Sequence, residues 1–297
     1  MKRIRQYKNK KKIALSITSR SLLLLVLLGL LPSCIKDKLL DYLDLFPMTL
    51  YASADYNHRG KDATIPSTYI MQSEYNTYAL PTDTSCPIEI MTRRGTQVLY
   101  AYNAADSVSM NANLMEAWVQ RVSGDTIQHI PEYFFSTFEY ISPQQAQPDS
   151  VHFQLEQQMR RLDIEIELGL PERQIITHGE GVLQGVYAMF NISTLEYSQD
   201  TFYVAFPLQL TQEALVSELH LFGFNPNISQ QLKLTLFLED GSRLTIEDDL
   251  SQELDSFNDD KLTPFHLGTQ LNLKHEAGFT ATLDDWIIED EKEIIVQ

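Results

Sequence analysis

The side chains that could do chemistry in this chain are few and scattered. No two of its seven histidines have the i, i+4 spacing with which a helix presents two imidazoles to one zinc ion. The G-x-S-x-G, P-loop and G-x-G-x-x-G motifs are also missing from the sequence. We therefore expect no catalytic site, no metal and no cofactor. The histidines are His58, His129, His152, His178, His220, His266 and His275.

Two acid pairs and one short segment leave alternatives open. Asp248-Asp249 and Asp284-Asp285 offer the oxygen ligands that calcium prefers, but neither lies in an EF-hand pattern. We favour solvated strand faces over calcium sites. Thr177–Gly181 places a histidine and a glutamate among glycines, and we expect a loop between strands there, not a site.

Cys34 differs from all of these because of what precedes it. The apolar run Leu22–Leu31 is ten residues long, whereas a bilayer core needs about 20. Eight Lys or Arg residues lie before this run, and no acidic residue occurs before Cys34. A basic segment, a short apolar run and a small residue form the pattern of a signal peptide. We expect residues 1–33 to be removed by cleavage between Ser33 and Cys34.

The end of this leader, Leu31-Pro32-Ser33-Cys34, resembles the bacterial lipobox. Pro32 departs from the small residue usual at that place. The resemblance implies that Cys34 is acylated on sulfur and at its new amino terminus, and Ile35 in place of Asp implies sorting to the outer membrane. Residues 34–45 would then form a lipid-anchored tether. The alternative is a secreted protein in which Cys34 carries no lipid.

Charge and cysteine content narrow the class of protein further. The net charge is −17, and loss of the eight basic residues in 1–33 would make it −25. Such an acidic chain repels nucleic-acid phosphates, so we exclude nucleic acid as a partner. Once Cys34 is acylated, Cys86 is the only other cysteine, and no intramolecular disulfide can form.

The dominant hydrophobic period is two, which is the period of a strand with one buried face. Phe202–Leu210 alternates in this way, and Pro207 indicates a sheet edge because proline cannot donate to a strand ladder. LKLTLFLEDGSRLTIEDDL predicts a hairpin that turns at Asp240-Gly241. Further strands are predicted at 47–54, 68–71, 88–91, 98–102, 151–155, 162–168, 182–192 and 279–283, and a helix at Asn111–Val122.

Short strands with turns between them and almost no helix indicate an all-β fold of antiparallel β-sandwiches. The polar segment Leu195–Thr201 lacks an apolar pattern and is the best boundary between two domains. We expect an N-terminal sandwich at 46–197 and a C-terminal sandwich at 198–297. A switch of apolar parity near Arg160-Arg161 predicts a bulge or a strand break.

The order of these segments resembles the fimbrillin superfamily of Bacteroidetes, most closely its FimB/Mfa2-type branch of fimbrial anchor and accessory lipoproteins. The resemblance implies two transthyretin-like β-sandwich domains on the outer membrane. The segments that carry it are Pro47–Leu50, Val98–Asn103, Arg161–Ile166 with Gly185–Tyr187, Phe279–Trp286 and a short closing strand at Ile294–Val296.

In that superfamily, subunits join by β-strand addition after an Arg/Lys-specific protease removes a first strand from stalk subunits. Anchor subunits keep this strand and their lipid. The resemblance therefore implies a non-enzymatic, surface-exposed anchor or accessory subunit with other fimbrial subunits as partners. Arg59, in Asn57–Lys61, is a possible cleavage loop, and cleavage there would indicate a stalk or tip subunit. The alternative function is a surface lipoprotein that binds glycan or another host or nutrient ligand.

Overall fold

A computed structural model describes residues 45–129, 132–143, 149–274 and 280–289. The predicted all-β class is confirmed, since this part of the chain holds strands, one short helix, α2 (Leu170–Ile175), and one 3-10 turn, η1 (Phe257–Asp259). None of its helices is long and apolar enough to cross a bilayer. Ser33, Cys34 and the expected strand Ile294–Val296 lie outside the described residues.

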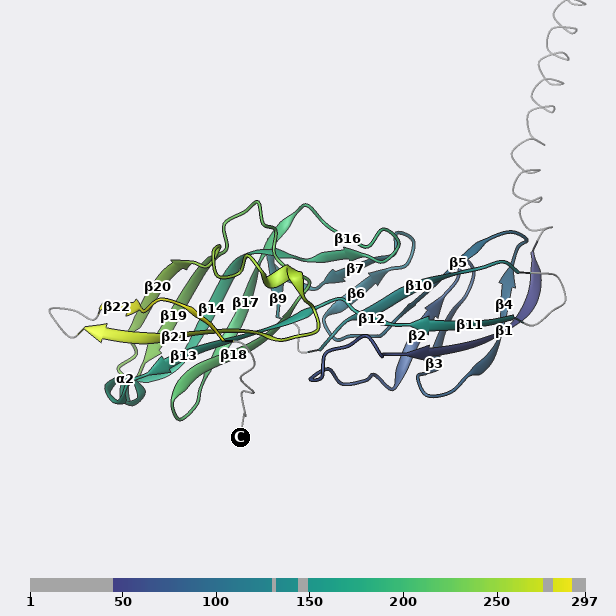
Figure 1. Cartoon of the computed structure of the whole chain (residues 1–297). Helices are drawn as coiled ribbons and strands as arrows, with labels where there is room; N and C mark the ends of the chain where they lie inside the picture. The colour runs from purple at the N-terminus through teal and green to yellow at the C-terminus, as the bar shows by residue number, and fades with distance from the viewer. Residues whose placement is uncertain (1–44, 130–131, 144–148, 275–279, 290–297) are drawn as a thin grey trace, which may run out of the picture.

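The first sandwich packs a three-stranded sheet, in the order β11-β1-β4, against a five-stranded sheet, in the order β12-β10-β5-β2-β3 (Figure 1). β1 is central in its sheet and pairs parallel with β11 and antiparallel with β4. Its alternate residues, among them Leu50 and Ala52, are fully buried. The strands are β1 (Phe46–Asp55), β2 (Thr68–Gln72), β3 (Thr77–Pro81), β4 (Cys86–Thr92), β5 (Gln97–Tyr102), β10 (Phe135–Ile141), β11 (Asp149–Gln154) and β12 (Glu156–Gln157).

The second sandwich is built on a sheet whose main path runs β20-β19-β14-β17-β18-β13-β21-β22. β17 pairs with β14 along most of its length and with β18 only at Gln209 and Leu210, so it joins the two layers. The strands are β13 (Arg160–Leu168), β14 (Ile176–Tyr187), β17 (Thr201–Leu210), β18 (Ala214–Leu221), β19 (Gln231–Leu238), β20 (Arg243–Asp249), β21 (Phe265–Lys274), β22 (Thr280–Leu283) and β23 (Ile287–Glu289).

A smaller four-stranded sheet, in the order β16-β15-β7-β6, lies between the two halves of the molecule (Figure 1). The chain enters it from the first sandwich, attaches β8 and β9 beside β17, and returns to the first sandwich as β10. The two halves are therefore linked by three crossings of the chain. The strands are β6 (Val108–Asn111), β7 (Glu116–Val119), β8 (Arg121–Ser123), β9 (Thr126–Gln128), β15 (Met189–Asn191) and β16 (Glu196–Tyr197).

Strand pairing crosses the division that we expected between residues 197 and 198. β13 pairs with β18 and β21, and β14 pairs with β17 and β19. The polar segment at 195–201 contains β16, which pairs with β15 in the four-stranded sheet, and ends at the first residue of β17. We propose a division near Gln158, where the chain leaves β12 of one sandwich and enters β13 of the other. The predicted strand break lies at this point, just before Arg160. The segment with β7 and β9 is the part of the first half that pairs across this division, with β15 and β17.

Two local predictions were wrong. Asn111–Val122 is not a helix but the end of β6, a turn and the strands β7 and β8. The buried residues Met115, Ala117 and Val119 have a period of two, which the helical spacing of Leu114 and Trp118 obscured. Thr177–Gly181 lies inside β14 and not in a loop.

The hairpin at 231–249 is confirmed: β19 pairs with β20, and the turn uses Gly241 at φ 82°. Pro207 does not lie on an edge strand, because β17 is inside the sheet. On the side of β17 away from β14, however, β9 pairs only with Tyr203–Ala205 and β18 only with Gln209 and Leu210. Pro207 lies in the gap between these partners, where no ladder donor is needed.

Tyr69 gives a test of the first core. It is fully buried, and its hydroxyl has no hydrogen-bond partner in the part of the chain that the structure describes, an arrangement that costs about 1–3 kcal/mol. We expect Tyr69→Phe to raise the unfolding free energy by roughly 1 kcal/mol in urea titrations at pH 8. Tyr203→Phe, a change at an exposed tyrosine, should have no effect.

The same variant tests the alkaline limit of stability. Burial, with the charges of Cys86 and Tyr56 adding to it, raises the pKa of Tyr69 far above its usual value. The folded state holds Tyr69 in its neutral form, whereas the unfolded state can ionise it above its pKa of about 10. The unfolding free energy is therefore unaffected by this ionisation below about pH 10, and it falls as the pH rises from there toward the folded pKa. Unfolding above pH 10 should show a weaker loss of stability in Tyr69→Phe than in the wild type. Equal losses would contradict this account.

Candidate functional site

The candidate site lies on the charged face of β13, where strand pairing brings charged residues from distant parts of the sequence together. The inward residues of β13, such as Leu162 and Ile164, are fully buried, and the residues between them are charged. Because side chains alternate along a strand, the charges all lie on one face of the sheet. They are Arg161, Asp163, Glu165 and Glu167.

Asp163 is the centre of an ion-pair cluster on this face. Only 2% of its side chain is exposed. Arg161 Nε donates to its Oδ1 at 2.7 Å, and His266 Nδ1, on β21, lies 2.9 Å from its Oδ2. Pairing places these groups side by side, since Asp163 is opposite both His266 and Glu218. The buried carboxylate thus accepts a hydrogen bond from Arg161 and lies within ion-pair distance of His266. Asp163 Oδ2 and His266 Nδ1 have no hydrogen-bond partner among the described residues.

The cluster also connects the two sandwiches. Arg161 lies 3.4 Å from Glu218 and 3.5 Å from Asp62, which follows β1 in the first half. Asp62 in turn accepts a hydrogen bond from the hydroxyl of Tyr133, whose ring packs edge-on against His220 at 4.2 Å. Burial acts to lower the pKa of Arg161, but the hydrogen bond to Asp163 and the three nearby carboxylates raise it above its ordinary value.

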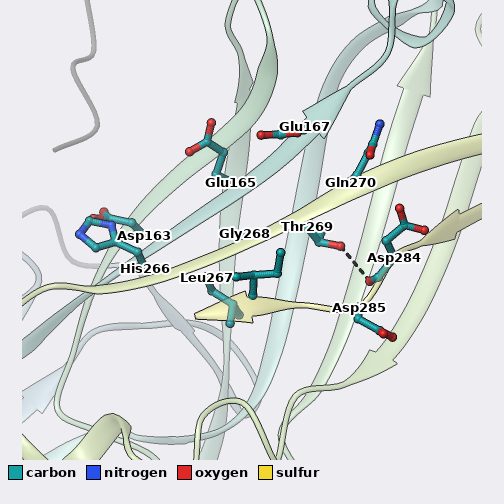
Figure 2. Close-up of a pocket in the computed structure, with 11 residues that line it drawn as sticks. Asp163, Glu165, Glu167, His266, Leu267, Gly268, Thr269, Gln270, Asp284 and Asp285 are labelled. Carbon is teal, nitrogen blue, oxygen red and sulfur yellow. Dashed lines mark hydrogen bonds and ion pairs between the residues drawn. The ribbon is translucent and has the colours of Figure 1, made fainter. Parts of the chain in front are cut away.

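A cleft of about 170 Å³ opens beside this cluster, with carboxylates from two segments around it. Figure 2 shows Glu165 and Glu167 on one side of β21 and Asp284 and Asp285 on the other. The acid pair Asp284-Asp285 therefore lines the same cleft as the acids of β13. Among the described residues no group of three possible ligands could hold a metal ion. The cleft can attract positive charge, but it has no built metal centre.

The motif ATLDDW, at 281–286, closes the second sandwich. Asp284 N donates to Gln270 O at 3.0 Å, and Thr269 Oγ1 donates to Asp284 O at 2.9 Å. Trp286 Nε1 then reaches β20 and donates to Asp248 Oδ2 at 2.9 Å. After this turn the chain returns to β21 as β23. The motif is thus a structural clasp between the two ends of the main sheet.

Arg59, the possible cleavage site, lies in a packed segment. Its Nη1 donates to Tyr56 O at 2.8 Å, and the next residue, Gly60, is buried with its N–H donating to Gln157 Oε1 at 2.9 Å. A Cβ on Gly60 would meet Leu262 O at 2.4 Å. A protease needs an extended, accessible segment, so cleavage after Arg59 would require this region to open first.

The two free edges of the β11-β1-β4 sheet differ. At the β4 edge, Met91 N donates to Asn76 Oδ1 at 2.9 Å, and the Tyr78 hydroxyl donates to Glu89 O. These side chains of the β2–β3 hairpin occupy the ladder groups of β4. At the other edge, β11 pairs with β1 on one side and with no strand on its other side within the described residues.

Comparison with known proteins is informative for the fold alone. No protein-family model matches the sequence, and no curated relative matches it. The fimbrial anchor Mfa2 from Porphyromonas gingivalis has a similar structure, with a TM-score of 0.55, 11% identity and coverage of 82% of this chain and 97% of that chain. The chain has a fimbrillin-type fold.

Two further solved structures share this fold. A candidate adhesin from Bacteroides ovatus matches at a TM-score of 0.56 and 12% identity over 80% of this chain and 92% of that chain. A candidate polysaccharide-binding protein from Bacteroides thetaiotaomicron matches at 0.50 and 10% identity over 83% and 99%. The predicted fimbrillin-type architecture is thus confirmed.

The Asp163 cluster could not be identified from the sequence. The alternation of charged and apolar residues from Arg161 to Glu167 was visible, and it correctly indicated a strand. Asp62, Glu218 and His266 could not be assigned to it, because they come from distant segments of the chain that only strand pairing brings together.

Replacing the buried carboxylate tests the cluster. Asp163→Asn removes the closest anionic partner of Arg161 and leaves Glu218 and Asp62 near it, so we expect a loss of about 1.5–3 kcal/mol in unfolding free energy, the range for a hydrogen bond to a charged group. Glu167→Gln, on the exposed end of the same face, should change it by less than about 0.5 kcal/mol. Chemical denaturation at pH 7 measures both. Equal effects of the two changes would contradict a central role for Asp163.

Proposed function

We propose that this chain is a non-enzymatic outer-membrane lipoprotein that serves as an anchor or accessory subunit of a fimbria. The observation that carries the proposal is the fold shared with the fimbrial anchor Mfa2 over 97% of that chain. The leader and the lipobox-like Leu31–Cys34 support a lipid on Cys34, with the folded part on the cell surface. Two or more acyl chains suffice for stable attachment to a membrane.

The packing of the Arg59–Gly60 bond supports an anchor over a trimmed stalk subunit. β1 is paired along both sides, and its apolar face is buried in the first core. Its removal would expose Met48, Leu50 and the facing core residues. Because the Arg59–Gly60 bond is packed, the protein resists the cut that would release this strand. A subunit that keeps its first strand also keeps its connection to the lipid.

The free edge of β11 supports assembly by strand addition. Val151 and Phe153 point into the core and Ser150 and Gln154 are exposed, so β11 has the alternation of a regular strand. A strand from another subunit can bond to such an edge through its main chain. The β4 edge is a poor acceptor because Asn76 and Tyr78 already occupy it. We assign the β11 edge as the acceptor.

The mature amino terminus tests the anchor role. Mass spectrometry of protein from the native outer membrane should find an acylated Cys34 as the first residue. Cys34→Ala should leave the folded part intact and lose membrane attachment in fractionation, while Arg59→Ala should change neither. A mature protein that begins at Gly60 would contradict the anchor and favour a stalk or tip subunit.

Site-specific photocrosslinking tests the assigned edge. A photoreactive residue at Ser150 on β11 should crosslink to another fimbrial subunit in the native host. The same residue at Glu89, which is exposed at the opposite edge of the sheet, is the matched control and should not. Crosslinks from Glu89 alone would place the acceptor at β4 and overturn the assignment.

Glycan binding is the second candidate function. One neighbour in fold is a candidate polysaccharide-binding protein, and this is the observation that favours the second function. Binding to a glycan and attachment to a fimbria can coexist in one surface protein.

A further inference from the structure

The outer face of the five-stranded sheet carries a row of aromatic side chains. On β5, Leu99 and Ala101 are buried in the core, and Tyr100 between them is on the opposite face. Strand register places Phe138 of β10 opposite Tyr100, and Tyr140 opposite Val98. Tyr140 is 64% exposed. Tyr100 and Phe138 are half-buried, so the row presents one exposed ring and two partly exposed ones, and apolar surface of this kind is often part of a binding site.

The three rings form a connected surface of fixed geometry. The Tyr100 and Phe138 centroids are 6.3 Å apart, and the Phe138 and Tyr140 centroids are 5.7 Å apart with the rings nearly perpendicular. Edge-to-face contacts of this kind are favourable, so the rings are held in place without a ligand. We call Tyr100, Phe138 and Tyr140 the aromatic row.

A cavity of about 570 Å³ adjoins the row at Tyr100. One wall is the turn between β6 and β7, with Asn113 exposed on it. The other wall consists of residues after β2 and β4, including Glu74 and Arg93. A volume of this size is ordinary for a small-molecule site.

The wall formed by the β6–β7 turn is fixed in advance. Gln72 Nε2 donates to Ala112 O at 3.1 Å, and the Tyr102 hydroxyl donates to Gln72 Oε1 at 3.2 Å. Met115 anchors the other end of the turn in the core, with 6% of its surface exposed. A preformed wall lowers the entropy that a ligand loses on binding.

The charges of this cavity favour a neutral ligand. Arg93 and Glu74 form an ion pair at 2.5 Å, and the Arg93 guanidinium also lies over the ring of Tyr75 at 5.6 Å, so the two charges offset each other. The other polar lining groups are amides and hydroxyls, such as those of Gln97, Asn113 and Thr96. The net charge of −17 further disfavours an acidic ligand.

We propose that the aromatic row and the adjoining cavity form a binding site for a neutral saccharide. The C–H face of a pyranose ring packs on an aromatic ring, while its hydroxyls exchange hydrogen bonds with amide and hydroxyl side chains. The site goes beyond the anchor role and does not depend on it. It lies on a different sheet from the β11 edge, so a bound saccharide leaves that edge free.

The test uses the complete mature chain with Cys34→Ala, which keeps it in solution. An array of neutral, sialylated and sulfated oligosaccharides gives the ligand class, and titration calorimetry with the best neutral oligosaccharide gives the Kd. We expect binding to neutral saccharides, and at least a tenfold higher Kd for both Tyr140→Ala and Asn113→Ala. Tyr203→Ala, an exposed tyrosine on β17 of the second sandwich, is the matched control and should bind as the wild type does.

Three results would overturn the proposal: no neutral saccharide bound, binding only to acidic saccharides, or equal weakening by Tyr203→Ala. Asn113 is exposed, so Asn113→Ala should leave the unfolding transition unchanged. Tyr140→Ala loses the edge-to-face contact with Phe138, about 0.5–1.5 kcal/mol, and circular dichroism checks that both variants are folded at the temperature of the titration. An array without saccharide binding would not affect the proposed anchor function, because the Cys34 and β11 experiments measure membrane attachment and crosslinking instead.

Discussion

The ion-pair cluster around Arg161 joins the two sandwiches through charges that are mostly removed from solvent. The Asp163 side chain, only 2% exposed, accepts a hydrogen bond from Arg161 at Oδ1 and has His266 at 2.9 Å from Oδ2, and a charge buried in this way needs such partners. The same guanidinium approaches Glu218 and Asp62, so one cation contacts carboxylates from both halves. Displacing one sandwich relative to the other would separate Arg161 from Asp62. The cluster therefore favours one relative placement of the halves, which the chain crossings at β6–β9 reinforce.

Local features of the sequence were predicted well, and features that depend on distant pairing were not. The β19–β20 hairpin was predicted because its two strands and its Asp240-Gly241 turn are adjacent in sequence. The expected division at 197/198 is crossed by strand pairing, because β13 pairs with β21, about a hundred residues later. A polar segment such as 195–201 has the same composition as a linker, although it contains β16. The apolar residues of Asn111–Val122 fit both the helical period and the strand period of two. The structure buries Met115, Ala117 and Val119, which have the period of a strand.

The candidate sites show the same limit. Tyrosine is abundant in the sequence, at 14 residues, but abundance does not distinguish a core from a surface. Only the register that sets Phe138 opposite Tyr100 reveals the aromatic row. Conversely, the motif ATLDDW was distinctive in sequence, and its role is structural: Trp286 binds Asp248 and joins the two ends of a sheet. A distinctive sequence motif in this fold can therefore stabilise the sheet without binding a ligand.

The proposed anchor role places a mechanical demand on the first sandwich, and its topology fits that demand. A lipid on Cys34 would pull on the chain just before β1, and a partner strand on β11 would pull on the neighbour of β1. Because β1 and β11 are parallel and pair over six positions, a pull along the strand axis loads their hydrogen bonds together, in shear. β4 holds β1 from the other side over seven positions. Tension would thus pass from membrane to partner through one sheet, while the saccharide site on the opposite sheet stays outside the loaded path.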